Sequence, residues 1–360
     1  MGLWLTEQEI LALPASGPAW DAVKAAADSL SGTADVDNQD EKQGEKCLAA
    51  ALIGRRLNSD AHAEKARKLL ASAPESENGG RTLALGRNLA AYVIAADTIA
   101  YRAPAFVDWL AKVRTETLDG MTLISTHEKR ANNWGTAAGA SRIAAALYLG
   151  DDTDLAKATK VLKGWLGDRA EYAGFKYGGT EWQADPAKPV GINAKGAARN
   201  GINIDGCLPD DQRRTGGLTA NPPAGNYVRA AISHSYVSAT LLWNHGIDVF
   251  SVSDEALRRA VVFFTQRAKG KFDSDDGWAI SLIEWAYPGL EAGADAPGSV
   301  GKTMAWTAWT HGDSTRGGAP EPPPPPGPTP LEQAHTLGQK IAAAATLADA
   351  KADAQKVLDL

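Results

Sequence analysis

Apolar residues recur at three- and four-residue spacing over most of this chain, which is the period of an amphipathic α-helix. Residues 83–101 show the pattern, with Leu85, Leu89, Tyr92 and Ala96 on it. Strand-like alternation is almost absent, and Gly, Pro or polar residues end each run. The pattern predicts helices over residues 20–30, 45–57, 61–72, 83–101, 104–113, 154–166, 227–243 and 254–269.

Helices that follow one another without intervening strands favour antiparallel hairpins. We therefore predict an all-α fold, an incomplete (α/α) toroid of such hairpins, over residues 1–316. Residues 317–330 are rich in Pro and Gly and predict an extended linker. Residues 331–360 predict one Ala-rich amphipathic helix whose apolar stripe needs a partner. We expect that helix to pair with a second copy, another protein or the main domain; an unpaired tail is the alternative.

The helical pattern stops over residues 167–226, where Gly, Pro, Asn, Asp and aromatic residues dominate. A segment this long without periodicity inside a helical domain is typical of a functional lid or cleft wall. Disorder is the alternative, but the aromatic residues argue against it. We expect this segment to border a binding site.

Charge and composition exclude several classes of function. The chain has 360 residues and a formal charge of −6 without a long basic run, which excludes a nucleic-acid or anionic-membrane footprint. No apolar run is long enough to span a bilayer, and no export signal is visible at the N-terminus. Cys47 and Cys207 lie far apart and outside any C-x-x-C pair, so we expect two buried thiols, no metal site and no cofactor.

Tryptophan is frequent, with 11 residues in the chain. Several lie near Gly, Asp or Thr, which favours partly exposed rings that stack on sugars. For any single Trp, core packing is the commoner explanation. The residues in question are Trp134, Trp165, Trp182, Trp278, Trp306 and Trp309.

A first polar cluster, Asn132-Asn133-Trp134-Gly135-Thr136, precedes a long run of small residues. A buried amide without hydrogen-bond partners costs roughly 1–3 kcal/mol, so the pair suits the floor of a polar cleft better than a core. The alternative is that the asparagines only cap the helix that follows. Capping leaves the second Asn and the Trp unexplained.

Two further clusters carry cations and acid–base groups. The first runs from Asn203 to Arg214 and contains Asp205, Arg213 and Arg214, and the second runs from Tyr227 to Tyr236 and contains His234. With the amides and the upstream His127, these groups lie near the ends of separate predicted helices. Such a set can neutralise a carboxylate and move a proton.

The three clusters resemble the alginate lyase-like uronate polysaccharide lyases, which have an α/α toroid fold. The resemblance covers roughly residues 83–288 and rests on the Asn132–Thr136 motif, on Asp205-Gly206-Cys207-Leu208-Pro209 followed by an arginine, and on Arg229-Ala230 before Ser233-His234-Ser235-Tyr236. In that family the counterpart of Asn133 neutralises the uronate carboxylate, an arginine assists, and a Tyr with a neighbouring His transfers protons. The resemblance implies an acidic polysaccharide as substrate and extracellular or periplasmic action, although the sequence itself predicts no location.

Two departures from that family's pattern change the expected site. Trp134 stands where the family has His, so His127 is a candidate replacement, and Ser233 stands opposite the catalytic Tyr, which moves that role to Tyr236 or Tyr227. We expect a neighbouring arginine to lower the pKa of Tyr236 and His234 to act as a partner base near neutral pH without a large shift. The expected catalytic residues are Asn133, Arg214, His234 and Tyr236. The expected substrate-binding residues are Asn132, Trp134, His127, Arg130, Arg213, Tyr227, Trp182 and Asp205.

The implied reaction is β-elimination in an alginate- or glucuronan-like polymer. Removing the proton beside a uronate carboxylate builds enolate charge, and one well-placed donor lowers that barrier by about 3–4 kcal/mol. A glycoside hydrolase is an alternative that needs two carboxyl groups flanking the scissile bond. The third possibility is a non-enzymatic glycan-binding or assembly protein, favoured by the linker, the terminal helix and the missing Tyr. The carboxyl candidates for hydrolysis are Glu128, Glu181, Asp205, Asp210 and Asp211.

Overall fold

The computed structural model describes residues 2–294 and 296–317, which fall within one compact unit, Met1–Pro320. The predicted linker, apart from Gly317, and the predicted helix at 331–360 lie outside the described residues. The predicted domain boundaries therefore stay predictions.

The described residues form helices α1–α14 and one two-stranded sheet, which confirms the all-α prediction. All eight helices predicted from periodicity are present, with bounds close to those expected. They are α2 (Pro18–Ser29), α3 (Gln43–Arg56), α4 (Asp60–Ala71), α5 (Thr82–Thr98), α6 (Pro104–Val113), α9 (Asp152–Trp165), α11 (Asn226–Asn244) and α12 (Val252–Val262). The helix after the asparagine pair is α8 (Asn133–Leu149), and the shorter helices are α1 (Glu7–Ala12), α7 (Leu123–Lys129), α10 (Pro209–Gln212), α13 (Ala279–Ala286) and α14 (Thr307–Thr310).

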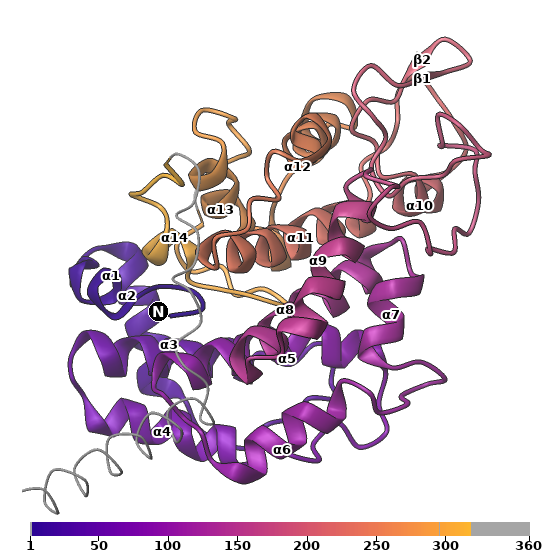
Figure 1. The fold of residues 1–360 in the computed structure, drawn as a ribbon. Helices are drawn as coiled ribbons and strands as arrows, with labels where there is room; N and C mark the ends of the chain where they lie inside the picture. Colours follow the sequence, from indigo (N-terminus) through magenta and orange to yellow (C-terminus); the bar gives the residue numbers. More distant parts are fainter. Residues whose placement is uncertain (1, 295, 318–360) are drawn as a thin grey trace, which may run out of the picture. The chain divides into compact units, whose positions relative to one another are not determined.

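Helices α3, α5, α8 and α11 form a row in which each contacts the next (Figure 1). These four helices are buried along almost their whole length, and alanine and glycine fill the contacts between them. Helices α4, α9 and α12 pack against this row on its outer side, each following the row helix that precedes it in the chain. The arrangement agrees with helix hairpins; closure of the row into a toroid stays a prediction.

Neighbouring helices of the row run parallel. Ser141 of α8 donates to the carbonyl of Gly86 in the second turn of α5, while Arg102, just after α5, donates to the carbonyl of Tyr148 at the far end of α8. A Cβ at Gly86 would lie 2.9 Å from the backbone nitrogen of Ala138, so glycine is what allows the two backbones to approach. Because the row helices are parallel, their N-terminal ends gather on one side of the protein.

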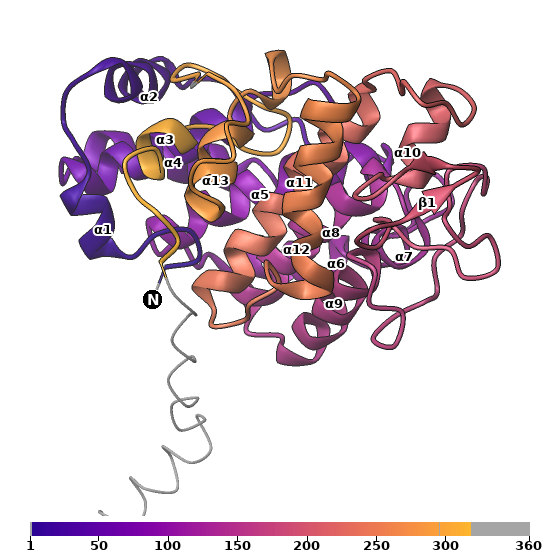
Figure 2. The same ribbon diagram turned by 90° about the horizontal axis from the view of Figure 1, so that it is seen from above.

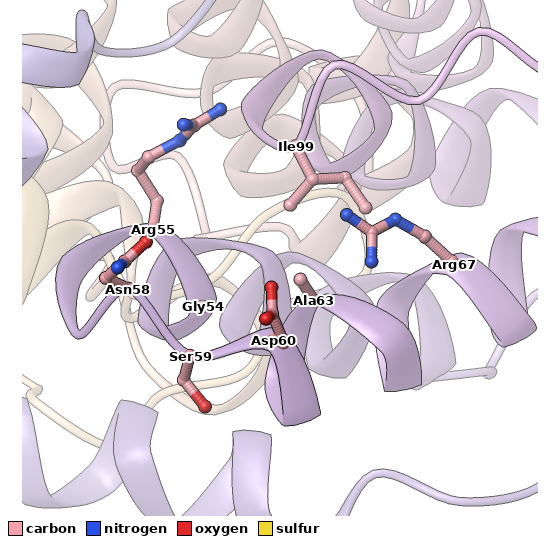
Figure 3. A pocket seen from close by; sticks show the side chains of 8 residues that line it. All are labelled: Gly54, Arg55, Asn58, Ser59, Asp60, Ala63, Arg67 and Ile99. Carbon is pink, nitrogen blue, oxygen red and sulfur yellow. The ribbon is translucent and has the colours of Figure 1, made fainter.

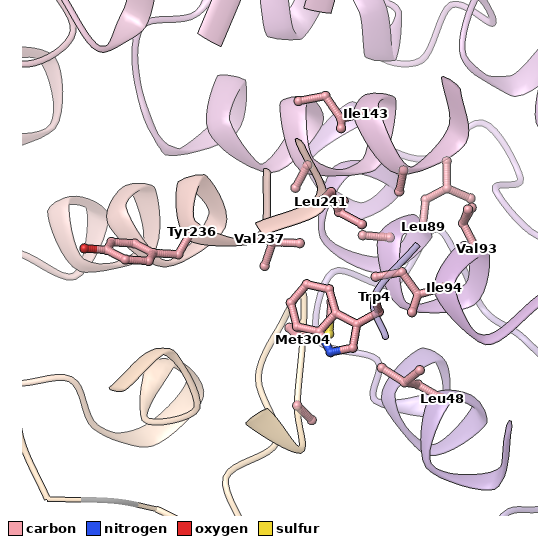
Figure 4. Close-up of a cluster of buried hydrophobic side chains, with 14 of the residues drawn as sticks. Trp4, Leu48, Leu89, Val93, Ile94, Ile143, Tyr236, Val237, Leu241 and Met304 are labelled. Atoms are coloured by element: carbon pink, nitrogen blue, oxygen red, sulfur yellow. The ribbon is translucent and has the colours of Figure 1, made fainter. Parts of the chain in front are cut away.

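A single large hydrophobic cluster fills the space around the row (Figure 4). Trp4 and Met304, from opposite ends of the described chain, pack in it against α3 and α5. The expectation of exposed tryptophan rings is wrong for five of the six candidates, since Trp165, Trp182, Trp278, Trp306 and Trp309 are at most 3% exposed. Only Trp134 is half-buried.

The predicted irregular segment, residues 167–226, is mostly loop and includes the short helix α10 (Figure 2). It also contains the antiparallel strands β1 (Ala198–Arg199) and β2 (Ile202–Asn203), and its Trp182, Ile204 and Cys207 form a small hydrophobic cluster with Phe263. Cys47 and Cys207 are both buried free thiols, as predicted. None of the described helices combines the length and apolar character that crossing a bilayer requires.

Buried titratable groups predict a stability maximum in mildly acidic solution. Burial lowers the pKa of His234 and His311 to about 3, so unfolding takes up protons below pH 6.5 and the free energy of unfolding falls as the pH falls from 6.5 towards 3. Burial raises the pKa of Glu41 to about 7 and of Glu45 to about 8, so unfolding releases protons above pH 4.5 and the free energy falls as the pH rises towards 8. Between pH 4.5 and 6.5 the histidines make the free energy of unfolding rise with pH and the glutamates make it fall, so the two effects oppose each other.

We therefore expect the urea midpoint to be highest between pH 4.5 and 6.5. Glu45→Gln removes one of the two carboxyl groups whose ionisation lowers the free energy of unfolding at higher pH. In this variant the urea midpoint should therefore fall less steeply between pH 6.5 and 8. A Glu45→Gln profile parallel to that of the unsubstituted protein would show that Glu45 does not cause the decline.

Candidate functional site

Several of the predicted site residues, Asn133, Arg214 and Tyr227 among them, meet at the N-terminal ends of α8 and α11, next to α10 and the 3-10 turn Arg213–Thr215. The first turn of a helix carries unpaired backbone N–H groups and a partial positive charge. The site therefore lies where the fold itself favours an anion.

The two asparagines have different roles. Asn132 is the N-cap of α8: its side-chain oxygen accepts from the N–H of Trp134 at 3.2 Å, and its amide nitrogen donates to Asp210 at 3.1 Å. Asn133 is the first helical residue and is 1% exposed, with its side-chain oxygen accepting from Arg214 at 3.4 Å. No described residue accepts a hydrogen bond from the side-chain nitrogen of Asn133. Capping therefore explains Asn132 and leaves the Asn133 amide N–H₂ for another partner.

Arg214 contacts both the side-chain amide of Asn133 and the phenol ring of Tyr227. Its guanidinium carbon lies 3.2 Å from the ring centroid of Tyr227, which is 40% exposed. A guanidinium over an aromatic face is an attractive arrangement that holds both side chains in place. An amide, a cation and a phenol from three separate elements are thus contiguous, with Arg214 and Tyr227 open to solvent above the buried Asn133.

His234 lies beneath Asn133 on α11. Its Nδ1 is 3.3 Å from the backbone carbonyl of Asn133, and because a carbonyl only accepts, Nδ1 carries the proton. Burial, helped by the charge of Arg87, lowers the pKa of His234 to about 3, so the ring is neutral in ordinary buffers. The expectation that His234 keeps an unshifted pKa is wrong. The ring instead holds the backbone of Asn133.

Arg87 on α5 is a buried arginine near the site that the sequence did not reveal. Burial lowers the pKa of Arg87, and its positive charge contributes to the lowered pKa of His234, which places Arg87 near that ring. No described residue accepts a hydrogen bond from its Nε. In the sequence it is one arginine inside a periodic helix, where a charged residue indicates only a solvated face.

Tyr236 lies away from these groups. It is fully buried, with its ring against Phe250 and Tyr287, and its hydroxyl has no hydrogen-bond partner among the described residues (Figure 4). Burial raises the pKa of Tyr236 well above its usual value, contrary to the lowered pKa expected from a nearby arginine. The geometry disfavours Tyr236 as the proton-transfer residue and favours Tyr227.

Trp182 and Asp205, two of the expected substrate-binding residues, have structural contacts instead. Trp182 is 1% exposed and donates from its indole nitrogen to the carbonyl of Gly216. Asp205 forms a 2.6 Å ion pair with Arg259. Neither residue contacts Asn133, Arg214 or Tyr227 among the hydrogen bonds and ring contacts of the described chain.

The remaining expected residues surround the first turn of α8. Arg130 lies over the ring of Trp134, with 4.4 Å between guanidinium carbon and ring centroid, and Arg213 donates to Asp210 at 3.0 Å. His127 is 4% exposed and packs so closely on α8 that a Cβ at Gly139 would lie 2.8 Å from its Nε2. Burial lowers the pKa of His127 well below its usual value, so it is a neutral packing residue and not a solvent-exposed base.

The carboxyl groups proposed for hydrolysis are mostly engaged in the fold. Glu128 forms an ion pair with Arg142, Asp210 one with Arg213, and Asp205 the one with Arg259. Asp211 is fully buried, and only Glu181 is exposed. This arrangement offers no open pair of carboxyl groups flanking a sugar, so it disfavours the hydrolase alternative.

A separate hollow of about 100 Å³ lies where α3 ends and α4 begins (Figure 3). Arg55, Ser59 and Arg67 are among the residues that line it. It lies at the C-terminal end of α3 and contains none of the predicted site residues. Nowhere in the described ranges do three or more His, Cys, Asp or Glu side chains gather in a way that could hold a metal ion.

Comparison with known proteins finds one similar family. Residues 87–177 match the family model described as Alginate lyase. This part of the chain resembles the alginate lyases. The match begins at Arg87 and includes Asn132 and Asn133, but it ends before Arg214, Tyr227 and His234. No curated protein and no solved structure matches the chain.

The alginate lyase match confirms the resemblance seen in the sequence and supports a polysaccharide lyase function. Its matched segment runs from α5 through α9 and therefore supplies two of the row helices, α5 and α8. The residues on α11 and on the turn before it complete the site from outside that segment.

Proposed function

We propose that this alginate lyase-like protein cleaves a uronate-containing polysaccharide by β-elimination. The observation that carries the proposal is the contact of Asn133, Arg214 and Tyr227, an amide, a cation and a phenol, at the N-terminal ends of two parallel helices. β-Elimination needs these three kinds of group around one sugar.

Asn133 and Arg214 would bind the uronate carboxylate. The free N–H₂ of Asn133 and the guanidinium of Arg214 are donors, and the first turn of α8 adds its partial positive charge. As the proton on the neighbouring carbon leaves, negative charge moves onto the carboxylate and these donors bind it more strongly. Arg87 adds a further positive charge beneath the site.

Tyr227 would transfer the proton. As the phenolate it takes the proton from the carbon beside the carboxylate, a carbon–carbon double bond forms, and the bond to the glycosidic oxygen breaks with its electron pair. The resulting phenol then returns the proton to that oxygen. His234 is neutral and holds the Asn133 carbonyl, so it positions the amide and does not serve as the base.

The sugar next to the reacting unit would contact Trp134. This ring is half-buried, and Arg130 lies over it, so one aromatic surface stands beside the asparagine pair. Aromatic rings stack on the apolar faces of sugars. An acidic polysaccharide is therefore the proposed partner of this face. Self-association or protein docking through residues 331–360 is a separate proposal, because those residues lie outside the described ones.

The test is a screen of alginate, glucuronan and neutral polysaccharides for product. A lyase gives an unsaturated sugar end that absorbs ultraviolet light, whereas a hydrolase gives reducing ends without absorbance. We expect absorbance to rise only with uronate polymers. Reducing ends without absorbance would favour hydrolysis, and binding without either product would favour a glycan-binding protein.

We also expect activity to survive metal removal, because the proposed mechanism assigns charge neutralisation to Asn133, Arg214 and helix N-termini. The measurement compares the rate on the preferred uronate polymer before and after exhaustive dialysis against a chelator. A loss of at least about tenfold that added Ca²⁺ or Mg²⁺ restores would show that a metal shares this role.

A further inference from the structure

Two adjacent acidic residues, Asp210 and Asp211, lie buried beside the N-terminus of α8. They are 2% and 0% exposed. Buried carboxyl groups are costly unless they are bound by donors, so their contacts indicate what they do. The proposed elimination assigns a role to neither of them.

Asp210 has a full set of donors. It accepts from the side-chain nitrogen of Asn132 at 3.1 Å, from the N–H of Gly178 at 2.7 Å and from Nε of Arg213 at 3.0 Å. These contacts join the loop, α10 and the N-cap of α8. Asp210 is thus explained by the fold.

Asp211 has one donor, and that donor belongs to the central residue of the proposed site. Its Oδ1 accepts from the backbone N–H of Asn133 at 3.3 Å, while its Oδ2 is buried without a hydrogen-bond partner among the described residues. Burial raises the pKa of Asp211 well above its usual value, although Arg213 and Arg214 lie near enough to oppose this. A neutral acid can keep the Asn133 contact without a second charge partner.

Asn133 is therefore held at each polar atom except one. Asp211 binds its N–H, His234 its backbone carbonyl, and Arg214 its side-chain oxygen. The atom left over is the amide nitrogen that the proposed reaction needs.

We propose that Asp211 is a positioning residue that fixes the Asn133 backbone, so that the Asn133 amide points at the substrate carboxylate. This inference rests on the proposed function. A displacement of about 1 Å in a catalytic group can cost about a hundredfold in rate, so one anchoring hydrogen bond can be decisive.

Two substitutions separate positioning from packing. Asp211→Leu keeps the number and branching of the side-chain heavy atoms and removes the acceptor, whereas Asp211→Asn keeps an acceptor oxygen. We expect Asp211→Leu to lower kcat on the preferred uronate polymer at least about tenfold with a smaller change in KM, and Asp211→Asn to stay within about threefold of the unsubstituted protein.

Hydrogen exchange provides a readout that does not depend on activity. The amide of Asn133 should exchange faster in Asp211→Leu than in the unsubstituted protein and in Asp211→Asn. Asp97→Leu is a matched control, because Asp97 accepts the backbone N–H of Leu3 at 2.8 Å far from the site. It should lower the thermal midpoint and leave both kcat and the exchange of Asn133 unchanged.

The outcomes distinguish the two proposals. Suppose that the unsubstituted protein is active and that the kcat of Asp211→Leu is unchanged, or falls no more than that of an equally stable Asp97→Leu. The positioning role of Asp211 is then wrong, and the proposed function stands. An unsubstituted protein that forms no unsaturated product overturns the proposed function, and unchanged Asn133 exchange in Asp211→Leu overturns the anchoring contact itself. If Asp211→Leu fails to fold, an Asp211→Asn variant with a tenfold lower kcat would equally contradict the proposal.

Discussion

Replacing Asn133 with alanine should lower turnover by about 100- to 1,000-fold, the range found when one oxyanion donor is removed. The substitution deletes the free amide N–H₂ and keeps the backbone N–H and carbonyl that Asp211 and His234 hold. The initial rate of unsaturated product formation measures the effect. The folded state should persist, because the helix cap is the neighbouring Asn132.

Asn132→Ala is the matched control for this prediction. It removes the cap and the contact to Asp210, so it should lower the free energy of unfolding by about 1 kcal/mol. Its effect on turnover should be smaller than that of Asn133→Ala. If Asn133→Ala unfolds at ordinary temperature while Asn132→Ala does not, Asn133 is mainly a structural residue and the proposed role is wrong.

Tyr227→Phe should lower turnover at least about a hundredfold, because it deletes only the hydroxyl that transfers the proton. Tyr236→Phe should leave turnover close to normal and should not destabilise the protein, since its buried hydroxyl has no hydrogen-bond partner to lose. Both variants are assayed on one uronate polymer, with thermal midpoints measured in parallel.

The opposite result would relocate the chemistry. If Tyr236→Phe is inactive and Tyr227→Phe is active, the reacting sugar must reach the side of α11 that the structure buries. The proposal that Asn133 and Arg214 bind the substrate carboxylate would then also be wrong, because neither residue contacts Tyr236. A loss in both variants would indicate that a change in packing and not a single hydroxyl controls the rate.

The helices could be predicted because they depend on a local repeat. Apolar residues at helical spacing gave all eight predicted helices, whereas short elements such as α10 and α14 have too few turns to show a period. The tryptophans were misjudged for a related reason. Neighbours in the sequence such as Gly and Asp do not report which side chains from distant segments cover a ring, and Trp278 and Trp309 are covered in this way.

The site could be predicted where a motif carried it and not where only the three-dimensional arrangement does. The motifs pointed to Asn133 and Arg214, whereas Tyr227 was only the alternative to Tyr236; the structure brings Asn133, Arg214 and Tyr227 together. Tyr236 follows His234 by two residues, which is about 200° around a helix, so it faces the core when His234 faces the site. Arg87 comes from a helix far back in the chain, and only the packing of α5 against α8 shows that it lies near the site.

Two glycines set the dimensions of this site without taking part in its chemistry. Gly86 allows α5 to approach α8, and Gly139 leaves room for the His127 ring. A methyl group at Gly86 would push α5, which carries Arg87, away from α8, which carries Asn133, and a methyl group at Gly139 would push His127 of α7 away from α8. In a mutational scan scored by activity, substitutions of both glycines would therefore lower activity, as substitutions of the reacting groups do. Only binding or structural measurements on those variants would distinguish a misaligned site from a missing functional group.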